Sequence, residues 1–487
     1  MTGTRESALL PVLKITAMLM IVLGALMVIP ALVDLSFGNE DWRVFAGASG
    51  ASLFFGTALL LSQNRPVVHL SLRQAFVMVN VAWFICSAAG ALPFMLAEVN
   101  LSLTDAFFEA VSGITTTGST VLTGLDHLPP GILLWRAILQ WIGGLGIIVT
   151  GISFFPALKI GGMQMFKVEA FDIDNKDFPQ AARISAGLVS VYLLLTLACA
   201  GALWLAGMTG LEAVVHAMTT LATGGFSTSD ASVGHFDSAV IEAVITLGMI
   251  AGGIPFLAYV RLVLGRQGKR FFDDQVRVYL AVLAVSMLSI ALWLMIMRDM
   301  SLGQSLRLSS FNVASVMTGT GYVSADYLLW GAFPMMYLLA LTLVGGCAGS
   351  TSCGMKIFRF QILFRVANQQ MRRLVFPSLA RAVRYRHMPV DPVVMASVQS
   401  FFFLFVITLA GLTTALTVTG LDFVTAISGA ATAMANVGPG LGEIIGPTGT
   451  FQSLPDSAKW LISAGMLIGR LEVLTVYVLF TRMFWLA

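Results

Sequence analysis

The sequence has little charge, little histidine and little cysteine. Charged residues make up 11% of its 487 residues, whereas soluble domains contain about 25%. Five histidines and four cysteines give no metal-ligand spacing, and Cys347 and Cys353 match no zinc pattern. The net charge of +3 is too small to indicate a polyanionic partner. These shortages exclude a soluble enzyme, a nucleic-acid-binding module and a disulfide-stabilised scaffold.

What the sequence does contain is long apolar runs, and 57% of its residues are hydrophobic. A helix needs about 20 apolar residues to span a bilayer, which predicts ten spans with both termini on one side. The first run begins near Lys14 and lacks a small-residue cleavage site, so we expect a retained helix rather than a signal peptide. The predicted spans are Ile15–Val33, Val44–Leu61, Ala75–Ala97, Gly131–Leu158, Ile184–Ala206, Ala239–Leu264, Val278–Met297, Ala332–Val344, Val394–Val418 and Trp460–Phe484.

Basic residues in the short connections predict the orientation, because such loops stay in the cytoplasm. Residues 358–390 contain no acid, and the opposite side carries acids such as Asp34, Glu98 and Asp126. Both termini are therefore expected on the cytoplasmic side. The simplest interpretation of the Arg-rich segment is a topology signal that contacts lipid headgroups, and a docking surface for a cytosolic partner is compatible with it. The basic residues concerned are Arg65, Arg73, Arg266, Lys269, Arg270, Arg277, Arg359, Arg365, Arg372, Arg373, Arg381, Arg384 and Arg386.

Four segments of similar pattern lie between these spans, at residues 104–120, 211–228, 305–324 and 421–443. Each has a short, mildly apolar stretch followed by a glycine-rich turn, and the shared glycine is Gly118, Gly225, Gly321 or Gly438. Asp105 lies 13 residues before Gly118, Glu212 lies 13 before Gly225 and Asp422 lies 16 before Gly438. Each of these carboxylates is placed where it can cap a helix N-terminus.

The repeated segments are too short and too polar to span, which predicts a re-entrant unit of helix, pore helix, extended filter loop and helix. Irregular backbone at membrane depth is tolerated only where protein buries it or where it lines a water-filled path. Four helix C-termini and four carbonyl-rich loops would converge on one volume that favours a cation. The alternative, in which the glycines only pack helices closely, explains neither the threonines nor the short preceding helix. We therefore expect an all-α polytopic membrane protein with four pseudo-repeats around one pore.

The repeats continue into the following span. Glycine pairs occur at Gly143-Gly144, Gly252-Gly253 and Gly345-Gly346, whereas the fourth repeat has Gly469-Arg470. An unpaired arginine in the membrane costs at least about 2.5–3.5 kcal/mol and normally faces the bundle interior. Our hypothesis is that Arg470 places a fixed positive charge in the conduit and limits leak. The alternative is a structural ion pair, for instance with Glu472.

The third repeat also has an unusual segment, Gly345–Gly354, which is rich in glycine, serine and threonine and is followed by Lys356. Such a composition cannot keep a regular helix in mid-membrane. We predict a break below the filter that acts as a flexible gate and leads into an amphipathic basic helix on the cytoplasmic side. A simple kink is the alternative.

The four repeats, the Gly345–Gly354 break and the sequence from Gly469 to Glu472 resemble the membrane subunit of Trk-type potassium uptake systems, TrkH/TrkG, in the Trk/Ktr/HKT superfamily. The resemblance covers the whole chain, including two extra N-terminal spans similar to those of TrkH. It implies a potassium-transporting homodimer in a bacterial inner membrane, with one pore per protomer. It also implies a cytoplasmic nucleotide-binding regulatory partner, a TrkA-like tetramer, beneath the pore.

The resemblance further implies particular roles for individual residues. The fourth filter, Asn436-Val437-Gly438-Pro439, departs from the Thr-Gly pattern, so the ring is not fourfold in its chemistry. The implied gating residues are Gly345, Gly346, Gly349, Gly354, Lys356 and Arg470. The implied potassium-binding residues are Thr116, Thr117, Gly118, Thr223, Gly224, Gly225, Gly319, Thr320, Gly321, Asn436, Val437 and Gly438.

These observations divide the chain into residues 1–66, with two helices, and four pore repeats at 67–170, 171–270, 271–388 and 389–487. The predicted function is potassium uptake through a gated filter. The alternative is a sodium- or proton-coupled symporter, but parallel repeats and the scarcity of acids in the spans favour the channel-like interpretation. His216 is expected to be a structural histidine rather than a proton relay. No phosphate-binding loop or nucleophile elbow indicates an enzyme, and no cofactor is expected beyond the transported K⁺.

Overall fold

The computed structural model describes residues 3–63, 71–153, 179–263, 271–378, 382–386 and 388–486. Several predicted features lie outside these residues. They are the basic residues Arg65, Arg266, Lys269, Arg270 and Arg381, the domain boundaries at 66, 170 and 270, and the ends of the predicted fourth and sixth spans.

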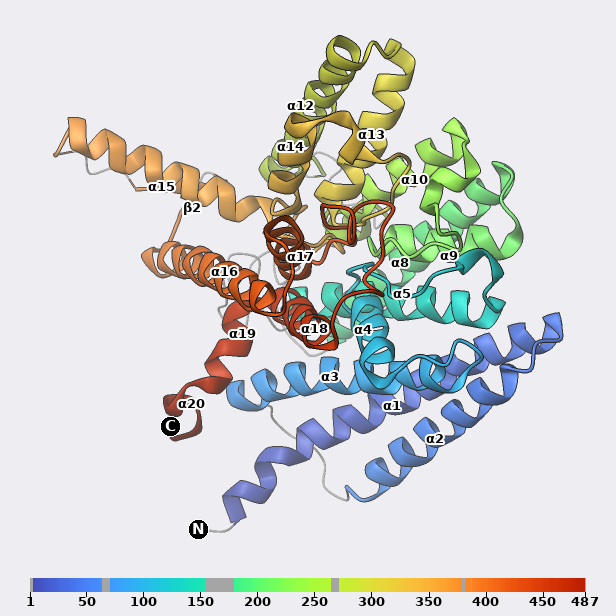
Figure 1. The fold of residues 1–487 in the computed structure, drawn as a ribbon. Helices are drawn as coiled ribbons and strands as arrows, with labels where there is room; N and C mark the ends of the chain where they lie inside the picture. Colours follow the sequence, from blue (N-terminus) through green and yellow to red (C-terminus); the bar gives the residue numbers. More distant parts are fainter. Residues whose placement is uncertain are drawn as a thin grey trace.

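Two N-terminal helices, α1 (Gly3–Phe37) and α2 (Trp42–Leu61), form a hairpin along one edge of the bundle (Figure 1). The Ser49 hydroxyl donates a hydrogen bond to the Gly24 carbonyl at 2.6 Å, so the two helices pack closely there. Asp34, buried in α1, accepts a 2.6 Å hydrogen bond from the Gly131 N–H at the start of α5. The hairpin is therefore attached to the first repeat.

Four repeats follow, each with a first helix, a short pore helix, a loop and further helical segments. The pore helices α4, α9, α13 and α17 have 12, 12, 17 and 13 residues and are too short to span, as predicted. The helices are α3 (Leu72–Leu96), α4 (Leu103–Ile114) and α5 (Pro130–Ser153); α8 (Pro179–Leu205), α9 (Gly210–Leu221), α10 (Ala239–Gly252) and α11 (Phe256–Val263); α12 (Asp274–Arg298), α13 (Leu302–Thr318), α14 (Ala332–Thr342) and α15 (Ile357–Val375); α16 (Pro392–Val418), α17 (Phe423–Ala435), α18 (Asp456–Arg470), α19 (Val473–Tyr477) and α20 (Arg482–Leu486).

Short elements complete the described fold. Two strands form a small antiparallel hairpin that pairs Arg384 with Pro389. The short elements are the 3₁₀ turns η1 (Leu125–His127), η3 (Ser232–Phe236), η5 (Tyr327–Trp330) and η6 (Val478–Phe480), and the strands β1 (Arg384–Tyr385) and β2 (Met388–Pro389).

Two predicted spans are not continuous, which corrects the sequence interpretation. Among the described residues, seven helices are long and apolar enough to span, and two further spans are bent pairs. α10 and α11 meet at 93° because Pro255 offers no N–H to the helix and restricts Ile254. α18 and α19 meet at 107° at Glu472, whose backbone is left-handed with φ of 63°. The predicted eighth span is the eleven-residue helix α14, which ends before the predicted break.

Each pore helix begins at a polar N-cap. The caps of α4 and α9 are Ser102 and Thr209 rather than the predicted carboxylates, because Asp105 and Glu212 are the third residues of their helices. Asp422 caps α17 itself, which accounts for its offset of one turn. Hydrogen bonds from Thr425 lower the pKa of Asp422. α13 has the same arrangement at Ser301 and Gln304, for which the sequence analysis gave no cap.

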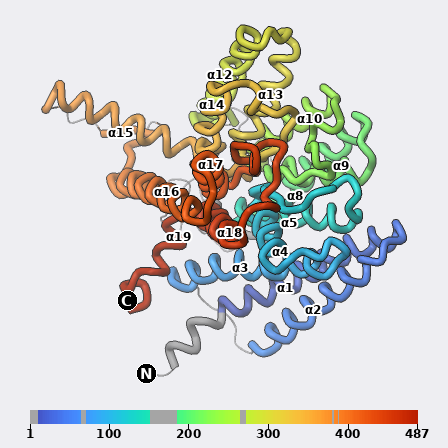
Figure 2. Tube along the Cα trace, in the orientation of Figure 1, coloured from blue at the N-terminus to red at the C-terminus, as the bar shows by residue number. Residues whose placement is uncertain are grey.

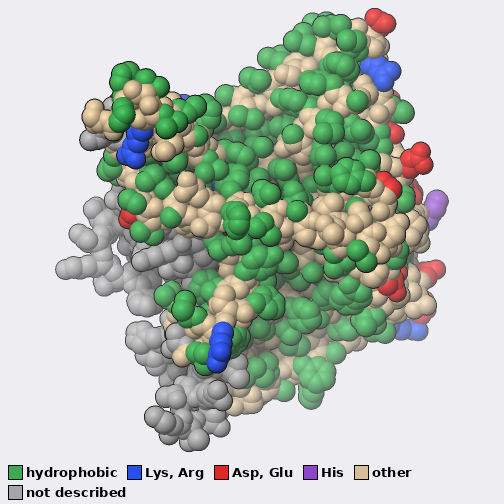
Figure 3. Space-filling view, turned by 60° about the vertical axis from the view of Figure 1, so that its left-hand side comes forward, with side chains coloured by type: hydrophobic (Ala, Val, Ile, Leu, Met, Phe, Trp, Pro, Cys, Tyr) green, Lys and Arg blue, Asp and Glu red, His purple; other side chains and the backbone are tan. Residues whose placement is uncertain are grey.

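The surface is that of a multi-pass membrane protein. Figure 3 shows a broad hydrophobic face, with Asp and Glu side chains gathered along its right-hand edge. In Figure 1 the start of α1 and the end of α20 lie on the same side as α15, and Figure 2 shows α15 projecting away from the bundle. All four cysteines are buried free thiols.

Candidate functional site

Each pore helix ends in a turn of nearly the same shape. In the first repeat, the N–H groups of Thr116 and Thr117 donate to the carbonyls of Gly113 and Ser112, a paired arrangement that closes a helix C-terminus. The second and fourth repeats have equivalent bonds, ending at Gly224 and Val437. The first residue of each filter triplet is left-handed: Thr116 (φ 54°), Thr223 (φ 52°), Gly319 (φ 80°) and Asn436 (φ 52°). The alignment of the repeats therefore matches their backbone conformation.

The left-handed backbone at Thr116, Thr223 and Asn436 is a strained conformation, because it costs about 1–3 kcal/mol at a residue other than glycine. Such strain persists only where surrounding contacts impose it and is concentrated at functional sites. Asparagine tolerates this conformation better than most residues. In the fourth filter, the Asn436 amide also donates to the Thr117 hydroxyl at 3.0 Å and to the Met466 carbonyl at 2.8 Å. The departure from the Thr-Gly pattern thus provides a link between the first and fourth filters.

The structure brings the four aligned glycines into one closed ring. Each is in contact with the next repeat, and the fourth is in contact with the first. Gly118, Gly225 and Gly321 have φ between 80° and 90°, a region that favours glycine. A Cβ atom added at any of these three glycines would lie under 3.0 Å from a backbone atom of the next repeat: Gly224 O for Gly118, Thr320 O for Gly225 and Gly438 N for Gly321. A Cβ atom added at Gly438 would have more room, because its nearest neighbour is the Gly118 carbonyl at 3.2 Å.

The ring separates two hollows. On one side, all four glycines line an open vestibule of about 580 Å³, which also contains Asp230 and Glu443. At its margin, hydrogen bonding from the Ser229 hydroxyl lowers the pKa of Asp126, so this carboxylate is ionised at neutral pH. On the other side, a cavity of about 40 Å³ touches Asn436 of the fourth filter. Carbonyl-rich backbone therefore forms the constriction between an acidic vestibule and an inner cavity.

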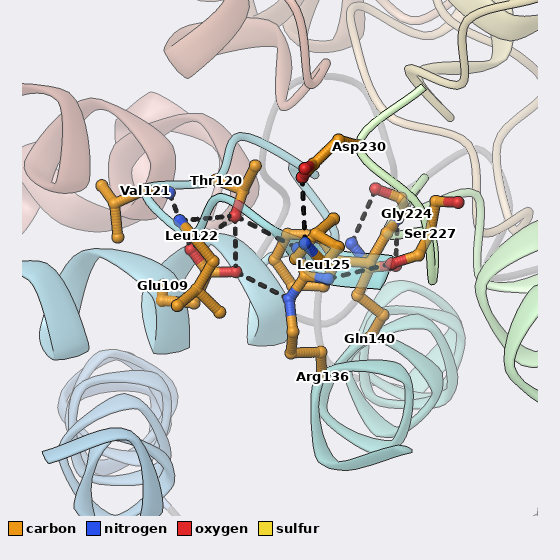
Figure 4. A network of polar contacts seen from close by, with 11 residues as sticks. Glu109, Thr120, Val121, Leu122, Leu125, Arg136, Gln140, Gly224, Ser227 and Asp230 are labelled. Atoms are coloured by element: carbon orange, nitrogen blue, oxygen red, sulfur yellow. Dashed lines mark hydrogen bonds and ion pairs between the residues drawn. The ribbon is translucent and has the colours of Figure 1, made fainter. Parts of the chain in front are cut away.

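Arg136 and Gln140, one turn apart on α5, connect the first pore helix to the second filter (Figure 4). Arg136 forms a 2.8 Å ion pair with Glu109 of α4, and both side chains are at most 1% exposed. Its guanidinium also donates to the Ser227 carbonyl at 3.0 Å. The Gln140 amide donates to the Gly224 carbonyl at 2.7 Å and accepts from the Phe226 N–H at 3.1 Å.

The sequence analysis missed this connection. A charged residue inside an apolar run is itself a signal of function, and Arg136 lies within the predicted span Gly131–Leu158. Its partner Glu109 is 27 residues away on another element, so sequence spacing does not indicate the pair.

Replacing Arg136 with glutamine should destabilise the protein by about 3–5 kcal/mol, because Glu109 would remain buried without its partner. The measurement is the thermal unfolding midpoint in detergent. Arg43→Gln is the matched control, because the Arg43–Glu40 pair is 66% and 78% exposed and should contribute little. Equal shifts for the two variants would contradict a structural role for Arg136.

The glycine pairs after the filters allow close approach to the pore helices. A Cβ at Gly143 would collide with the Ile114 carbonyl at the end of α4, and one at Gly469 would collide with the Met434 carbonyl of α17. Gly252 faces the Thr223 side chain and the Leu221 carbonyl in the same manner. The glycines of the first, second and fourth repeats therefore let a helix pack directly against the end of each pore helix, whereas Gly345 and Gly346 lie in a non-helical segment.

Residues 345–354 form a buried, non-helical loop below the ring. Its N–H groups donate to carbonyls of three repeats: Cys347 to Gly253 at 3.0 Å, Cys353 to Thr318 at 3.1 Å and Gly354 to Ala435 at 2.8 Å. The loop closes on itself where the Gly345 N–H donates to the Met355 carbonyl at 2.9 Å. The predicted break is present, and it is a hydrogen-bonded plug rather than a kink in a continuous helix.

Arg470 is buried beside this loop, and both lie against the inner cavity. Its guanidinium donates to the Cys353 sulfur at 3.0 Å and approaches the carbonyls of Thr351 at 3.5 Å and Gly143 at 3.4 Å. It forms no ion pair within the described chain, and its Nε atom has no hydrogen-bond partner there. Glu472, the alternative partner, instead pairs with Arg359. The alternative interpretation, an ion pair between Arg470 and Glu472, is therefore wrong.

Cys353 is a further residue whose role the sequence analysis missed. Its sulfur lies 3.4 Å from the Thr116 hydroxyl and 3.7 Å from the Thr116 carbonyl. It therefore joins the loop, the first filter and Arg470. The predicted gating residue Lys356 also lines the cavity and donates to the Ser352 carbonyl.

His216 lies behind the second filter rather than in the ring. One ring nitrogen is 2.9 Å from the Glu212 carbonyl and the other is 3.0 Å from the Ser227 hydroxyl. The imidazole also stacks on Tyr322, with ring centroids 5.8 Å apart. Both nitrogens have partners within the protein, which agrees with the structural interpretation.

Comparisons with known proteins find similarity along nearly the whole chain. The family model described as TrkH, cation transport protein, matches residues 43–485. The Trk system potassium uptake protein TrkI of Halomonas elongata is 45% identical over 476 residues, covering 98% of this chain and 96% of that protein. TrkH of Escherichia coli K12 is 36% identical over 478 residues, covering 97% and 98%. The crystal structure of the potassium transporter TrkH from Vibrio parahaemolyticus matches with a TM-score of 0.90 and 34% identity, over 97% of this chain and 99% of that one.

Proposed function

Because the chain belongs to the TrkH family of cation transport proteins, we propose that it is a potassium uptake transporter whose ions pass through the four-glycine ring. Its relatives are named as potassium uptake proteins. Potassium would enter from the acidic vestibule, exchange its hydration shell for backbone oxygens and reach the inner cavity. The proposed filter residues are the twelve triplet positions in the four repeats.

The closed ring of glycines is the observation that carries this proposal. Glycine is required at Gly118, Gly225 and Gly321 because their backbones are left-handed and press on a neighbouring repeat. The four pore helices end at the ring, so their partially negative C-termini favour a cation there. An inside-negative potential supplies about 2.3 kcal/mol per charge per 100 mV and needs no coupled ion.

The direct test is uptake of ⁸⁶Rb⁺ into proteoliposomes containing the full chain, with growth of a potassium-uptake-deficient bacterium at low potassium as a second readout. Uptake driven by the potential alone supports the proposal. If uptake requires a sodium or proton gradient, the symporter alternative replaces it. The absence of uptake from properly folded protein would contradict both.

We further propose that residues 345–354 and Arg470 form the gate. The loop and the arginine lie against a cavity of only about 40 Å³, and their hydrogen bonds reach three repeats. A cytoplasmic nucleotide-binding partner would act by moving α15, which begins three residues after the loop ends. This partner, the homodimer and the cytoplasmic orientation are proposals that follow from the family.

Replacing Cys353 with alanine should increase basal Rb⁺ flux several-fold, because it removes the sulfur contacts to Thr116 that join the loop to the first filter. Cys347→Ala is the control: Cys347 lies on the same loop and is buried in a hydrophobic core, but within the described residues its sulfur makes no hydrogen bond to Thr116 or Arg470. Flux is measured in proteoliposomes without any partner protein. An equal increase for Cys347→Ala would indicate general loosening of the loop rather than a specific link.

A further inference from the structure

A groove lined by arginines runs along α15, outside the conduit. It has a volume of about 380 Å³ and is lined by Arg365, Asn368, Gln369 and Arg372 of α15 and by the segment 382–384, which contributes Arg384. The four α15 positions are spaced as i, i+3, i+4 and i+7, so they share one face of the helix. The described lining residues are three arginines, two amides, an alanine and a valine.

Arg365 holds the two walls of this groove together. Its guanidinium donates to the Arg384 carbonyl at 2.5 Å and lies 5.3 Å from the centroid of the Tyr385 ring. Its nearest carboxylate is Asp274, at 3.9 Å. Arg365 thus has a structural task that fixes the width of the groove.

Arg372 and Arg384 have no such task. Within the part of the chain that the structure describes, neither guanidinium makes a hydrogen bond or an ion pair. Both are exposed, and each supplies a planar set of donors suited to phosphate oxygens. The groove therefore concentrates positive charge without a matching acid of its own.

A different side of α15 is apolar and exposed. Phe364 is 74% exposed, Met371 is 59% exposed and Leu374 is 76% exposed. A helix with adjoining apolar and arginine-rich faces is typical of a segment at the boundary between lipid tails and headgroups. A phosphate in the groove would then lie at headgroup level.

We propose that this groove binds a phosphate-bearing ligand through Arg372 and Arg384, and that the ligand is the headgroup of an anionic phospholipid. The same chemistry would accept a free phosphate, and the test below separates the two sources. Because the Ile357 N–H at the start of α15 donates to the Gly346 carbonyl at 3.1 Å, an occupied groove restrains the helix that is attached to the gate loop. This last consequence rests on the proposed function, whereas binding does not.

The test compares Arg372→Gln/Arg384→Gln with Arg73→Gln/Arg373→Gln, using the full-length protein. The control removes the same charge from exposed positions that do not line the groove. The protein is reconstituted in phosphatidylcholine nanodiscs to which increasing amounts of phosphatidylglycerol are added. Native mass spectrometry then counts the phosphatidylglycerol molecules bound to each protein. Two arginines at about 1 kcal/mol each predict a loss of about 30-fold in phosphatidylglycerol affinity. The control should stay near the wild-type value.

A second arm adds inorganic phosphate to protein in phosphatidylcholine and measures the shift in thermal unfolding. Loss of phosphatidylglycerol binding in the groove variant alone supports a lipid headgroup. A phosphate-dependent shift that only the groove variant loses, without any difference in lipid binding, contradicts the lipid assignment. The groove itself is contradicted if wild type, groove variant and control bind both probes equally. Rb⁺ flux at increasing phosphatidylglycerol content then tests the coupling to the gate separately.

Discussion

Replacing Arg470 with alanine should raise Rb⁺ flux about 30-fold in the absence of a partner protein. The guanidinium is buried against the inner cavity and has no carboxylate partner among the described residues. A unit charge about 8 Å from a passing ion raises its energy by about 2 kcal/mol at an effective dielectric constant of 20, and this corresponds to about 30-fold in rate. The measurement is initial ⁸⁶Rb⁺ uptake into proteoliposomes at a fixed potential.

Arg470→Lys is the matched control for this prediction. It keeps the charge but loses the planar contacts to Cys353 and Thr351, so flux should stay close to the wild-type value if charge is the barrier. Should lysine and alanine raise flux equally, the barrier would depend on those contacts rather than on charge. An alanine variant that folds and conducts like the wild type would remove Arg470 from the gate altogether.

Alanine substitutions in the ring should have effects that follow a specific order. Gly225→Ala and Gly118→Ala should abolish uptake, because the new methyl collides with a backbone carbonyl of the next repeat and φ is left-handed. Gly321→Ala should be severe, with its methyl 2.7 Å from Gly438 N. Gly438→Ala should be the mildest, because its nearest contact is 3.2 Å and its φ is not left-handed.

The readouts for this series are Rb⁺ uptake, the ratio of sodium to rubidium flux, and the unfolding midpoint. Loss of uptake with a near-normal unfolding midpoint would assign the effect to the filter rather than to folding. If Gly438→Ala were as damaging as Gly225→Ala, the ring geometry would not be what limits transport. Unchanged selectivity in every conducting variant would argue against ion contact at these positions.

The repeated pattern predicted much of the fold, because every copy carries a short stretch and a glycine turn, and three of the four carry a glycine pair. The bends in the second and fourth repeats were missed, although Gly252, Gly253 and Pro255 carry a readable signal for the first of them. The prediction followed the apolar composition of this span, which favours a continuous helix, and gave too little weight to these helix-breaking residues. The second bend depends on a left-handed Glu472, which no local pattern indicates.

The contacts that hold the site together could not be predicted to the same degree. Glu109 meets Arg136 across 27 residues, and Cys353 meets Thr116 across 237. Such pairs arise only when separate repeats pack together, so a single sequence carries no spacing that identifies them. The alternative of an ion pair between Arg470 and Glu472 was wrong for a related reason: proximity in sequence suggested it, whereas packing places Arg359 beside Glu472.

The presence of Gly469-Arg470 in one repeat alone follows from covalent linkage of all four units in a single polypeptide. A tetramer of identical chains would carry any substitution near its axis four times, and four neighbouring guanidinium groups would repel one another strongly in a space this small. Fusion lets three quadrants keep the small residue that close packing demands, while the remaining quadrant evolves a different chemistry. An arginine that one quadrant alone places beside an axial passage is thus an arrangement open to a fused pseudo-tetramer and closed to a strictly symmetric assembly.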